Sequence, residues 1–222
     1  MKLLIVRHGD PDYDIDSLTE KGWKEVEYLS QKLSKLDVKA FYVSPLGRAK
    51  DTAAPTLKKM GRTATECEWL KEFPCQIWRP DVKDKKIIAW DWLPQDWMAD
   101  ERFFQYDHWF ENEAMQEGHV KEEYDRVIGE FDKLLAKHGY EREGHYYKVN
   151  EENNDTIIFF CHFWIGVCTS QPSAEYLSDG TLAWLRGCPI LCDNFDHRRT
   201  PSGNCCFPYE LLRRYFPPLC QQ

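Results

Sequence analysis

The feature that most constrains the fold is a short apolar run near the start of the chain, Leu3–Val6, which leads directly into Arg7, His8 and Gly9. Four successive apolar residues, two of them β-branched, are typical of a strand buried on both faces. In an open α/β sheet, ligands bind at the carboxyl ends of the strands. This strand would therefore deliver a guanidinium that suits phosphate and an imidazole that can act as a nucleophile. The alternative is that Arg7 and His8 stand at the end of the strand by chance. Residues further along the chain distinguish between the two interpretations.

The next part of the chain alternates helical and extended patterns. A helix capped by Ser17 or Thr19 is expected to bury one apolar stripe, formed by Trp23, Val26, Leu29, Leu33 and Leu36. Ala40–Val43 is then expected to form a strand, and residues 47–59 a helix that Gly61 follows. Arg48 would lie at the start of this helix, where anions are favoured.

A different pattern begins near Trp78 and continues to Gly118. Five tryptophans lie there among many charges, without a steady period: Trp78, Trp90, Trp92, Trp97 and Trp109. We interpret this stretch as an inserted lid or subdomain, although most of these aromatic side chains would simply form a small core within it. After it, a helix is expected at 120–138 with Val127, Phe131, Leu134 and Leu135 on its apolar face, and a buried strand at 156–161 that ends at His162.

Composition limits the partners and the compartment. The 222 residues include 37 acidic and 29 Lys or Arg side chains, a balance that disfavours nucleic acid. No apolar stretch is long enough for a signal peptide or a membrane span, so we expect a cytoplasmic protein with no membrane partner. In that compartment the nine cysteines are expected to be reduced thiols.

Phosphoryl transfer through histidine needs an imidazole nucleophile, cations around the phosphoryl oxygens and an acid for the leaving oxygen. Four segments carry candidates for these roles and resemble the histidine phosphatase superfamily, in its phosphoglycerate-mutase-like branch. They are R-H-G at 7–9, S-P-L-G-R-A-K-D-T-A at 44–53, W-L-K-E-F at 69–73 and I-I-F-F-C-H at 157–162. L-T-E-K-G at 18–22 is also similar to that family's first-helix signature.

The resemblance implies a three-layer α/β/α sandwich with a mostly parallel central sheet and an inserted lid. It implies that His8 is phosphorylated, that Arg7, Arg48 and His162 complete the phosphate pocket with Gly9, and that Glu72 is the proton donor. Neither a metal nor another cofactor is implied. Asp10, Glu66 and Glu68 are nearby alternatives to Glu72, and Arg79, Lys85 and Lys86 could meet the rest of an anionic substrate.

The last 60 residues depart from the family pattern. His162 is followed by Phe163, Trp164 and Ile165 instead of an early glycine, and six of the nine cysteines lie beyond this point. A zinc site of Cys188, Cys192, Cys205 and Cys206 is conceivable, but the spacing fits no familiar finger and His197 is badly placed. Read one nucleotide later from Val167, permitted codons give V-L-L-S-H-L-L-N-I-S-P-M-V-L-W-H-G-F, which restores a helical period. We therefore predict a histidine phosphatase core at 1–162 and a frameshifted tail at 163–222.

Three functions remain open at this point. The first is hydrolysis of a small phosphorylated metabolite through a phosphohistidine. The second is a phosphoglycerate-mutase-type transfer, and the third is a catalytically dead protein that binds a phosphorylated ligand.

Overall fold

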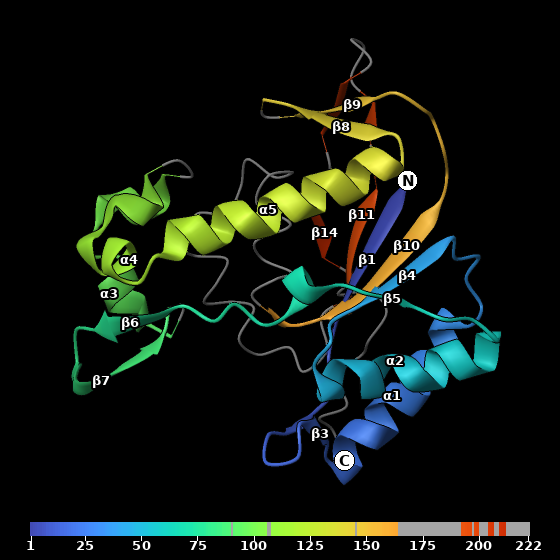
Figure 1. Ribbon diagram of the computed structural model, residues 1–222, viewed down its shortest axis with the longest axis horizontal. Helices are drawn as coiled ribbons and strands as arrows, with labels where there is room; N and C mark the ends of the chain where they lie inside the picture. The colour runs from blue at the N-terminus through green and yellow to red at the C-terminus, as the bar shows by residue number, and fades with distance from the viewer. Residues whose placement is uncertain are drawn as a thin grey trace.

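The computed structural model describes residues 1–89, 91–105, 108–144 and 146–163, and the backbone of 192–196, 198–199, 204–206 and 209–211. Within these residues the largest sheet has six strands in the order β14-β11-β1-β10-β4-β5 (Figure 1). Their bounds are β1 (Lys2–Arg7), β4 (Ala40–Val43), β5 (Thr65–Glu66), β10 (Thr156–Cys161), β11 (Cys192–Asp196) and β14 (Tyr209–Leu211). The strands expected at 3–6, 40–43 and 156–161 are therefore confirmed.

Four neighbouring strands of this sheet, β1, β10, β4 and β5, are parallel. In the register, Arg7 of β1 lies opposite Cys161 of β10, and Val43 of β4 lies opposite Phe160. The carboxyl ends of the three central strands therefore reach the same edge. The residues that follow them emerge side by side.

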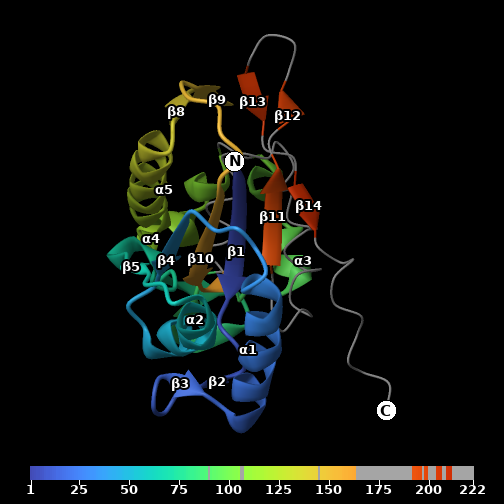
Figure 2. The same cartoon turned by 90° about the vertical axis from the view of Figure 1, so that its right-hand side faces the viewer.

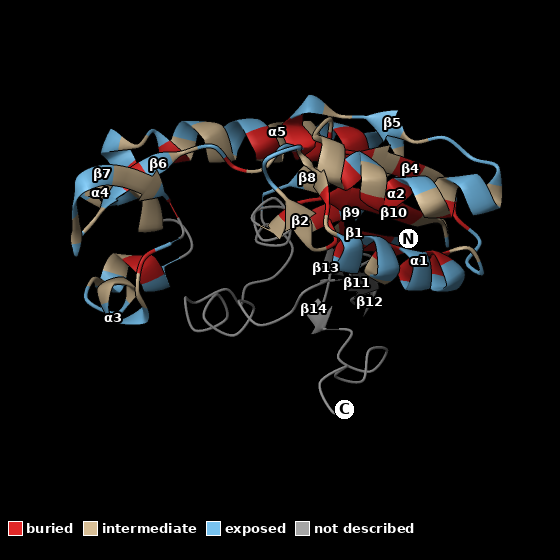
Figure 3. Cartoon of the chain, turned by 90° about the horizontal axis from the view of Figure 1, so that it is seen from below, coloured by how far each residue is buried: buried red, intermediate tan, exposed pale blue. Residues whose placement is uncertain are grey.

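Helices cover both faces of the sheet, which confirms the three-layer α/β/α architecture. One face packs against α1 (Glu20–Leu33) and α2 (Gly47–Met60), and the other against α5 (Val120–Lys137). Figure 3 shows α5 on one side of the strands and α1 on the other. Side chains alternate along β10, so Ile158 and Phe160 join the first core while Ile157 and Phe159 join the second.

The first helix is capped at Thr19, one of the two caps that the sequence predicted, but only part of the predicted apolar stripe is buried. Thr19 caps it by accepting a hydrogen bond from the Gly22 N–H, at 3.1 Å. Its buried residues are Gly22, Val26, Leu29, Ser30 and Leu33. The prediction that Trp23 and Leu36 are buried was wrong, since they are 42% and 40% exposed. The close approach of Gly22 to Asp10 sets the buried face, and Leu36 lies beyond the helix end.

The other two long helices agree with their patterns. Gly61 ends α2 in the left-handed conformation, with φ at 62°, which costs glycine nothing. In α5 the predicted apolar face of Val127, Phe131, Leu134 and Leu135 is buried. No helix among the described residues is long and apolar enough to cross a membrane.

The insert has more regular structure than its sequence indicated. It contains β6 (Gln76–Arg79), β7 (Val82–Ile88), α3 (Pro94–Trp97), η2 (Glu101–Phe104), η3 (Trp109–Glu111) and α4 (Glu113–Glu117). The hairpin β6–β7 was not expected, because most of its side chains are exposed and leave no alternating pattern. In Figure 1 the insert lies to one side of the sheet, beyond the start of α5.

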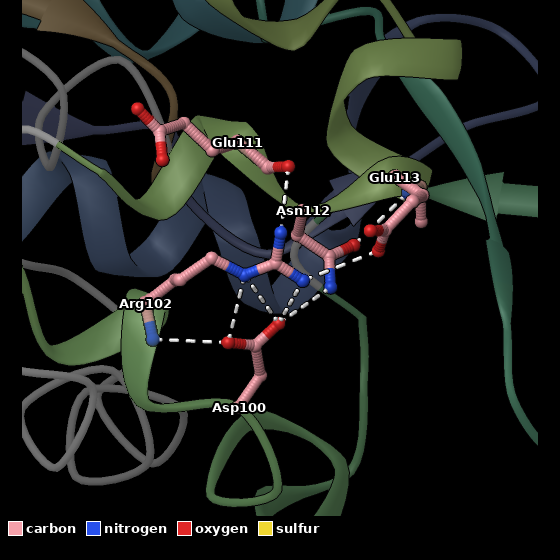
Figure 4. A network of polar contacts seen from close by, with 6 residues as sticks. Asp100, Arg102, Glu111, Asn112 and Glu113 are labelled. Carbon is pink, nitrogen blue, oxygen red and sulfur yellow. Dashed lines mark hydrogen bonds and ion pairs between the residues drawn. The ribbon is translucent and has the colours of Figure 1, made fainter.

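Two tryptophans of the insert, Trp92 and Trp97, belong to a small core within it, whereas Trp78 is 40% exposed. Trp92, Trp97 and Phe103 pack against one another, with ring centroids between 4.8 and 5.7 Å apart. Beside them, Asp100 binds the Arg102 guanidinium and the Asn112 amide (Figure 4). Trp90 lies outside the described residues.

Shorter elements complete the fold. They are β2 (Pro11–Asp12), β3 (Ser17–Leu18), η1 (Glu68–Leu70), β8 (Tyr140–Glu143), β9 (Tyr146–Val149), β12 (Arg198–Arg199) and β13 (Asn204–Cys206). The β8–β9 hairpin was not predicted.

Most of the tail predicted to be frameshifted lies outside the described residues, as do Trp164, Ile165, Cys188 and His197. Its described part contributes β11, which pairs antiparallel with β1, and β14 beyond it (Figure 2). The frameshift and the zinc site stay predictions.

Candidate active site

Two buried histidines lie together at the carboxyl edge of the parallel strands. The His8 N–H donates to the Cys161 carbonyl at 3.0 Å, which continues the pairing of β1 with β10 by one residue. The ring centroids of His8 and His162 are 5.2 Å apart, with 56° between the ring planes. Both side chains are almost fully buried. Two residues 154 positions apart in the chain therefore meet because their strands are parallel neighbours.

The hydrogen bond of His8 determines which ring nitrogen is free to react. Its Nδ1 is 2.8 Å from the Gly9 carbonyl oxygen, which can only accept, so Nδ1 carries the proton and Nε2 the lone pair. Burial lowers the pKa of His8 to about 4, and the nearby Arg7 and Arg48 charges add to this effect. The imidazole is therefore neutral near pH 7, as a nucleophile must be.

Gly9 supports this arrangement. Its N–H donates to the Thr52 hydroxyl at 3.0 Å, which ties the end of β1 to helix α2. A Cβ at this position would lie 3.1 Å from the Val26 side chain. Glycine allows the turn after β1 to lie close to α1.

His162 is held by Ser44, the residue that follows β4. The Ser44 Oγ is 2.9 Å from His162 Nε2 and also accepts a hydrogen bond from the Leu46 N–H at 3.3 Å. Burial lowers the pKa of His162 to about 2, with further lowering by Arg48, His8 and Arg7. Among the residues that the structure describes, the buried His162 Nδ1 has no hydrogen-bond partner.

Two arginines bring positive charge to the same place. Arg7 is the last residue of β1, and its guanidinium lies 5.7 Å from the centroid of the Phe163 ring. Arg48 is in the first turn of α2. Within the described part of the chain, the Nε atoms of both arginines are buried without a hydrogen-bond partner, like His162 Nδ1. Leaving a buried polar group unpaired costs about 1–3 kcal/mol, so three such atoms in one place indicate an anion with several acceptor oxygens.

Comparison with known proteins identifies the family of the chain. Residues 3–143 match the model of the histidine phosphatase superfamily, branch 1. The chain belongs to this superfamily.

Individual relatives of this superfamily match less of the sequence. A 2,3-bisphosphoglycerate-dependent phosphoglycerate mutase of Thermoplasma acidophilum is 37% identical over 60 residues, covering 22% of this chain and 30% of the mutase. The chain thus matches under a third of the length of that curated relative.

Solved structures with the same fold cover nearly the whole chain. Phosphoserine phosphatase of Entamoeba histolytica in complex with 3-phosphoglyceric acid has a TM-score of 0.58 at 14% identity, covering 96% of this chain and 98% of that one. A mycobacterial glucosyl-3-phosphoglycerate phosphatase with inorganic phosphate has a TM-score of 0.59 at 16% identity, covering 95% of both chains.

Glu72 is the residue that the resemblance implies as the proton donor of the reaction. Glu72 follows η1 and is half-buried, and its carboxylate accepts a hydrogen bond from the Phe73 N–H at 3.2 Å. Its role as proton donor stays a prediction. Of the three alternatives, Glu66 pairs with Lys50 at 2.6 Å, Glu68 with Lys71 at 2.5 Å, and Asp10 accepts the Thr19 hydroxyl proton at 2.7 Å.

The insert cations have acidic partners within the insert. Arg79 binds Asp81 and Asp91, and Lys86 lies 2.8 Å from Glu117. Their contact with a substrate, like that of Lys85, stays a prediction.

Sequence reasoning missed two residues at the site. Ser44 was the first residue of the family-like segment at 44–53 and was given no role, although it holds His162. Asp16 was one of several acidic residues in a loop, yet its carboxylate binds Arg48 Nη1 at 2.6 Å and the Gly47 N–H at 2.6 Å. Burial alone would raise the pKa of Asp16, but these hydrogen bonds outweigh it and lower that pKa. Its only sequence signal was its residue type, since Asp tolerates the positive φ of 48° found there.

Proposed function

We propose that this histidine phosphatase hydrolyses a small phosphorylated metabolite through a phosphohistidine at His8, without a metal or another cofactor. The observation that carries the proposal is the set of three buried atoms without partners, Arg7 Nε, Arg48 Nε and His162 Nδ1, around a neutral imidazole. A phosphoryl group supplies acceptor oxygens for all three. The two guanidinium groups supply the positive charge that the reaction requires around the phosphoryl oxygens.

The first step transfers the phosphoryl group to the protein. The His8 Nε2 lone pair attacks phosphorus, the bond from phosphorus to the ester oxygen breaks, and that oxygen takes a proton from the carboxylic acid of Glu72. In the second step a water molecule gives its proton to the Glu72 carboxylate and attacks phosphorus. The N–P bond breaks, inorganic phosphate leaves, and the His8 side chain is neutral again.

His162 would donate to a phosphoryl oxygen through Nδ1. This needs the tautomer in which Nε2 carries the lone pair, and Ser44 supports it. The Ser44 oxygen already accepts the Leu46 N–H, so its own proton can be donated to His162 Nε2. The imidazole of His162 then keeps its single proton on Nδ1, toward the phosphate.

The substrate class is supported by the relatives. Two structural neighbours are described with phosphoglycerate compounds, one as a glucosyl-3-phosphoglycerate phosphatase and one in complex with 3-phosphoglyceric acid. We place the reaction in the cytoplasm, on the support that Cys67 and Cys75 carry free thiols. No nucleic-acid or membrane partner is part of the proposal.

The matched mutase segment favours a second candidate, transfer of a phosphoryl group within phosphoglycerate. Phosphate release from phosphomonoesters, 3-phosphoglycerate among them, should be compared with isomerisation of 3-phosphoglycerate. The variants are His8→Gln and the matched control His119→Gln, which changes an exposed histidine. Release that only His8→Gln abolishes supports hydrolysis, whereas isomerisation without net release supports the mutase. Phosphate binding without either reaction would mean a binding protein and overturn the proposal.

We also propose that the tail at 163–222 results from one extra nucleotide just after the codon for Phe163. Sequencing the genomic DNA across this codon tests the proposal directly. An unshifted reading frame with the printed codons in related strains would refute it. The same phosphate-release assay on a chain with the restored frame measures how much the tail affects activity.

A further inference from the structure

Asp16 connects a surface loop to the proposed phosphate site. It lies in the loop between β2 and β3, and its carboxylate divides its two oxygens between two donors of helix α2. Oδ2 accepts the Gly47 N–H at 2.6 Å, and Oδ1 accepts from Arg48 Nη1 at 2.6 Å. One side chain thus caps the helix and holds the guanidinium that the helix presents.

This contact depends on a glycine in the helix. A Cβ at position 47 would lie 2.1 Å from the Asp16 carbonyl oxygen and 3.2 Å from its Oδ2. The loop can therefore approach α2 closely only if residue 47 has no side chain.

The loop also touches a face of the same guanidinium. The centroid of the Tyr13 ring lies 5.4 Å from Arg48 Cζ, within the range of a cation–π contact. Asp16 accepts from Arg48 Nη1, so the edge of the guanidinium formed by Nε and Nη2 stays available to a ligand. In the described part of the chain, Nε of this edge is buried and has no hydrogen-bond partner. That edge is the two-donor fork by which arginine binds phosphate.

We propose that Asp16 is a positioning residue that orients the Arg48 guanidinium so that its Nε and Nη2 edge faces the phosphoryl group. The inference rests on the proposed function, because it assigns a purpose to the orientation of Arg48 in that site. Asp16 does not touch the substrate and acts through Arg48.

Two explanations of the role of Asp16, through its negative charge alone or through the positioning of Arg48, predict opposite effects when Asp16 is neutralised. A carboxylate near a phosphate dianion repels it, so removal of the charge alone would strengthen phosphate binding. If Asp16 positions Arg48, its removal misaligns a donor that must match the transition state, and activity falls.

Asp16→Asn separates these effects with little change to the fold. Asn tolerates a positive φ as Asp does. Gly47 and Arg48 donate to different oxygens of Asp16, and the NH2 group that replaces one of them in Asn cannot accept, so one of the two contacts is lost. Asp14→Asn is the matched control, because Asp14 is an exposed residue of the same loop and loses the same charge.

The experiment measures kcat and KM for phosphate release, together with the affinity for inorganic phosphate, in the full chain. We expect Asp16→Asn to lower kcat/KM by about 10- to 100-fold, mainly through kcat, and to weaken the binding of inorganic phosphate, whereas Asp14→Asn should leave both within about twofold. In an Arg48→Lys background, Asp16→Asn should cost no more than about threefold, because the residue acts through Arg48. Thermal unfolding of each variant confirms that it is folded.

Two results would overturn the inference while leaving the proposed function intact. One is an active parent in which Asp16→Asn behaves like Asp14→Asn. The other is a full loss from Asp16→Asn that persists unchanged in the Arg48→Lys background. A parent that releases no phosphate refutes the proposed function. The inference is then judged by phosphate affinity, which must fall in Asp16→Asn and not in Asp14→Asn; a parent that does not bind phosphate overturns both.

Discussion

The two buried histidines should make the stability of this protein depend steeply on pH. The folded pKa values of His8 and His162 are lowered to about 4 and about 2, from 6.5 in the unfolded chain. Between about pH 4 and 6.5 the unfolded chain therefore binds more protons than the folded one, so the free energy of unfolding rises with pH there. The full contribution is present above pH 6.5 and is lost as the pH falls.

The magnitude follows from the proton difference. At pH 5.5 an unfolded imidazole with a pKa of 6.5 is about 90% protonated and the folded one nearly neutral, so each histidine adds about 1 kcal/mol per pH unit to the slope. Between pH 7 and pH 4, His8 and His162 together remove about 6 kcal/mol. That is comparable with the whole stability of an ordinary domain, about 5–15 kcal/mol.

Urea unfolding at several pH values between 5 and 6.5 measures this slope. His8→Gln and His162→Gln should each lower the slope near pH 5.5 by about 1 kcal/mol per pH unit relative to the parent. Thr56→Val is the control, because Thr56 is buried and does not titrate, so it changes the stability but not the slope. If both Gln variants keep the slope of the parent, the histidines are not held neutral by burial, and the reasoning about the nucleophile fails with it.

Three further changes test the contacts around the site and the core. Gly47→Ala places a Cβ 2.1 Å from the Asp16 carbonyl oxygen, so we expect a melting temperature lower by several degrees and activity reduced by about tenfold or more. Ser44→Ala leaves His162 Nε2 buried without its partner; denaturant unfolding should show a loss of about 1–3 kcal/mol, and phosphate release should slow by about tenfold. Val127→Ala in the core under α5 should cost about 2 kcal/mol in the same unfolding assay and leave kcat unchanged.

The elements with strong local signals were predictable from the sequence. The sequences of β1 and β10 are mainly apolar, and each is followed by a histidine. Such a run predicts a buried strand more directly than any other structure. The α5 helix shows its core face in a clear three- and four-residue spacing. Trp23 and Leu36 were wrongly assigned to the core for two different reasons. The approach of Gly22 to Asp10 decides which face of α1 is buried, and Leu36 lies beyond the end of the helix. Periodicity shows neither.

The part of the site that depends on long-range contacts was not predictable. The pairing of β1 with β10 brings His8 close to His162. The separation of the two residues in the sequence does not predict this contact, which only the resemblance to the superfamily implied. Asp16 reaches Arg48 across 32 residues because a loop folds back onto α2. Such contacts leave no periodic signal.

The most direct test of the account is to find where the phosphoryl group goes. The full chain is mixed with 4-nitrophenyl phosphate and with 3-phosphoglycerate, each labelled on phosphorus, and stopped in alkaline detergent, because phosphohistidine is labile in acid. Mass spectrometry of the peptides then locates the label. The account predicts label on His8 in the parent and in His119→Gln, and none in His8→Gln. Phosphate release that continues in His8→Gln, or a label on another residue, would contradict it.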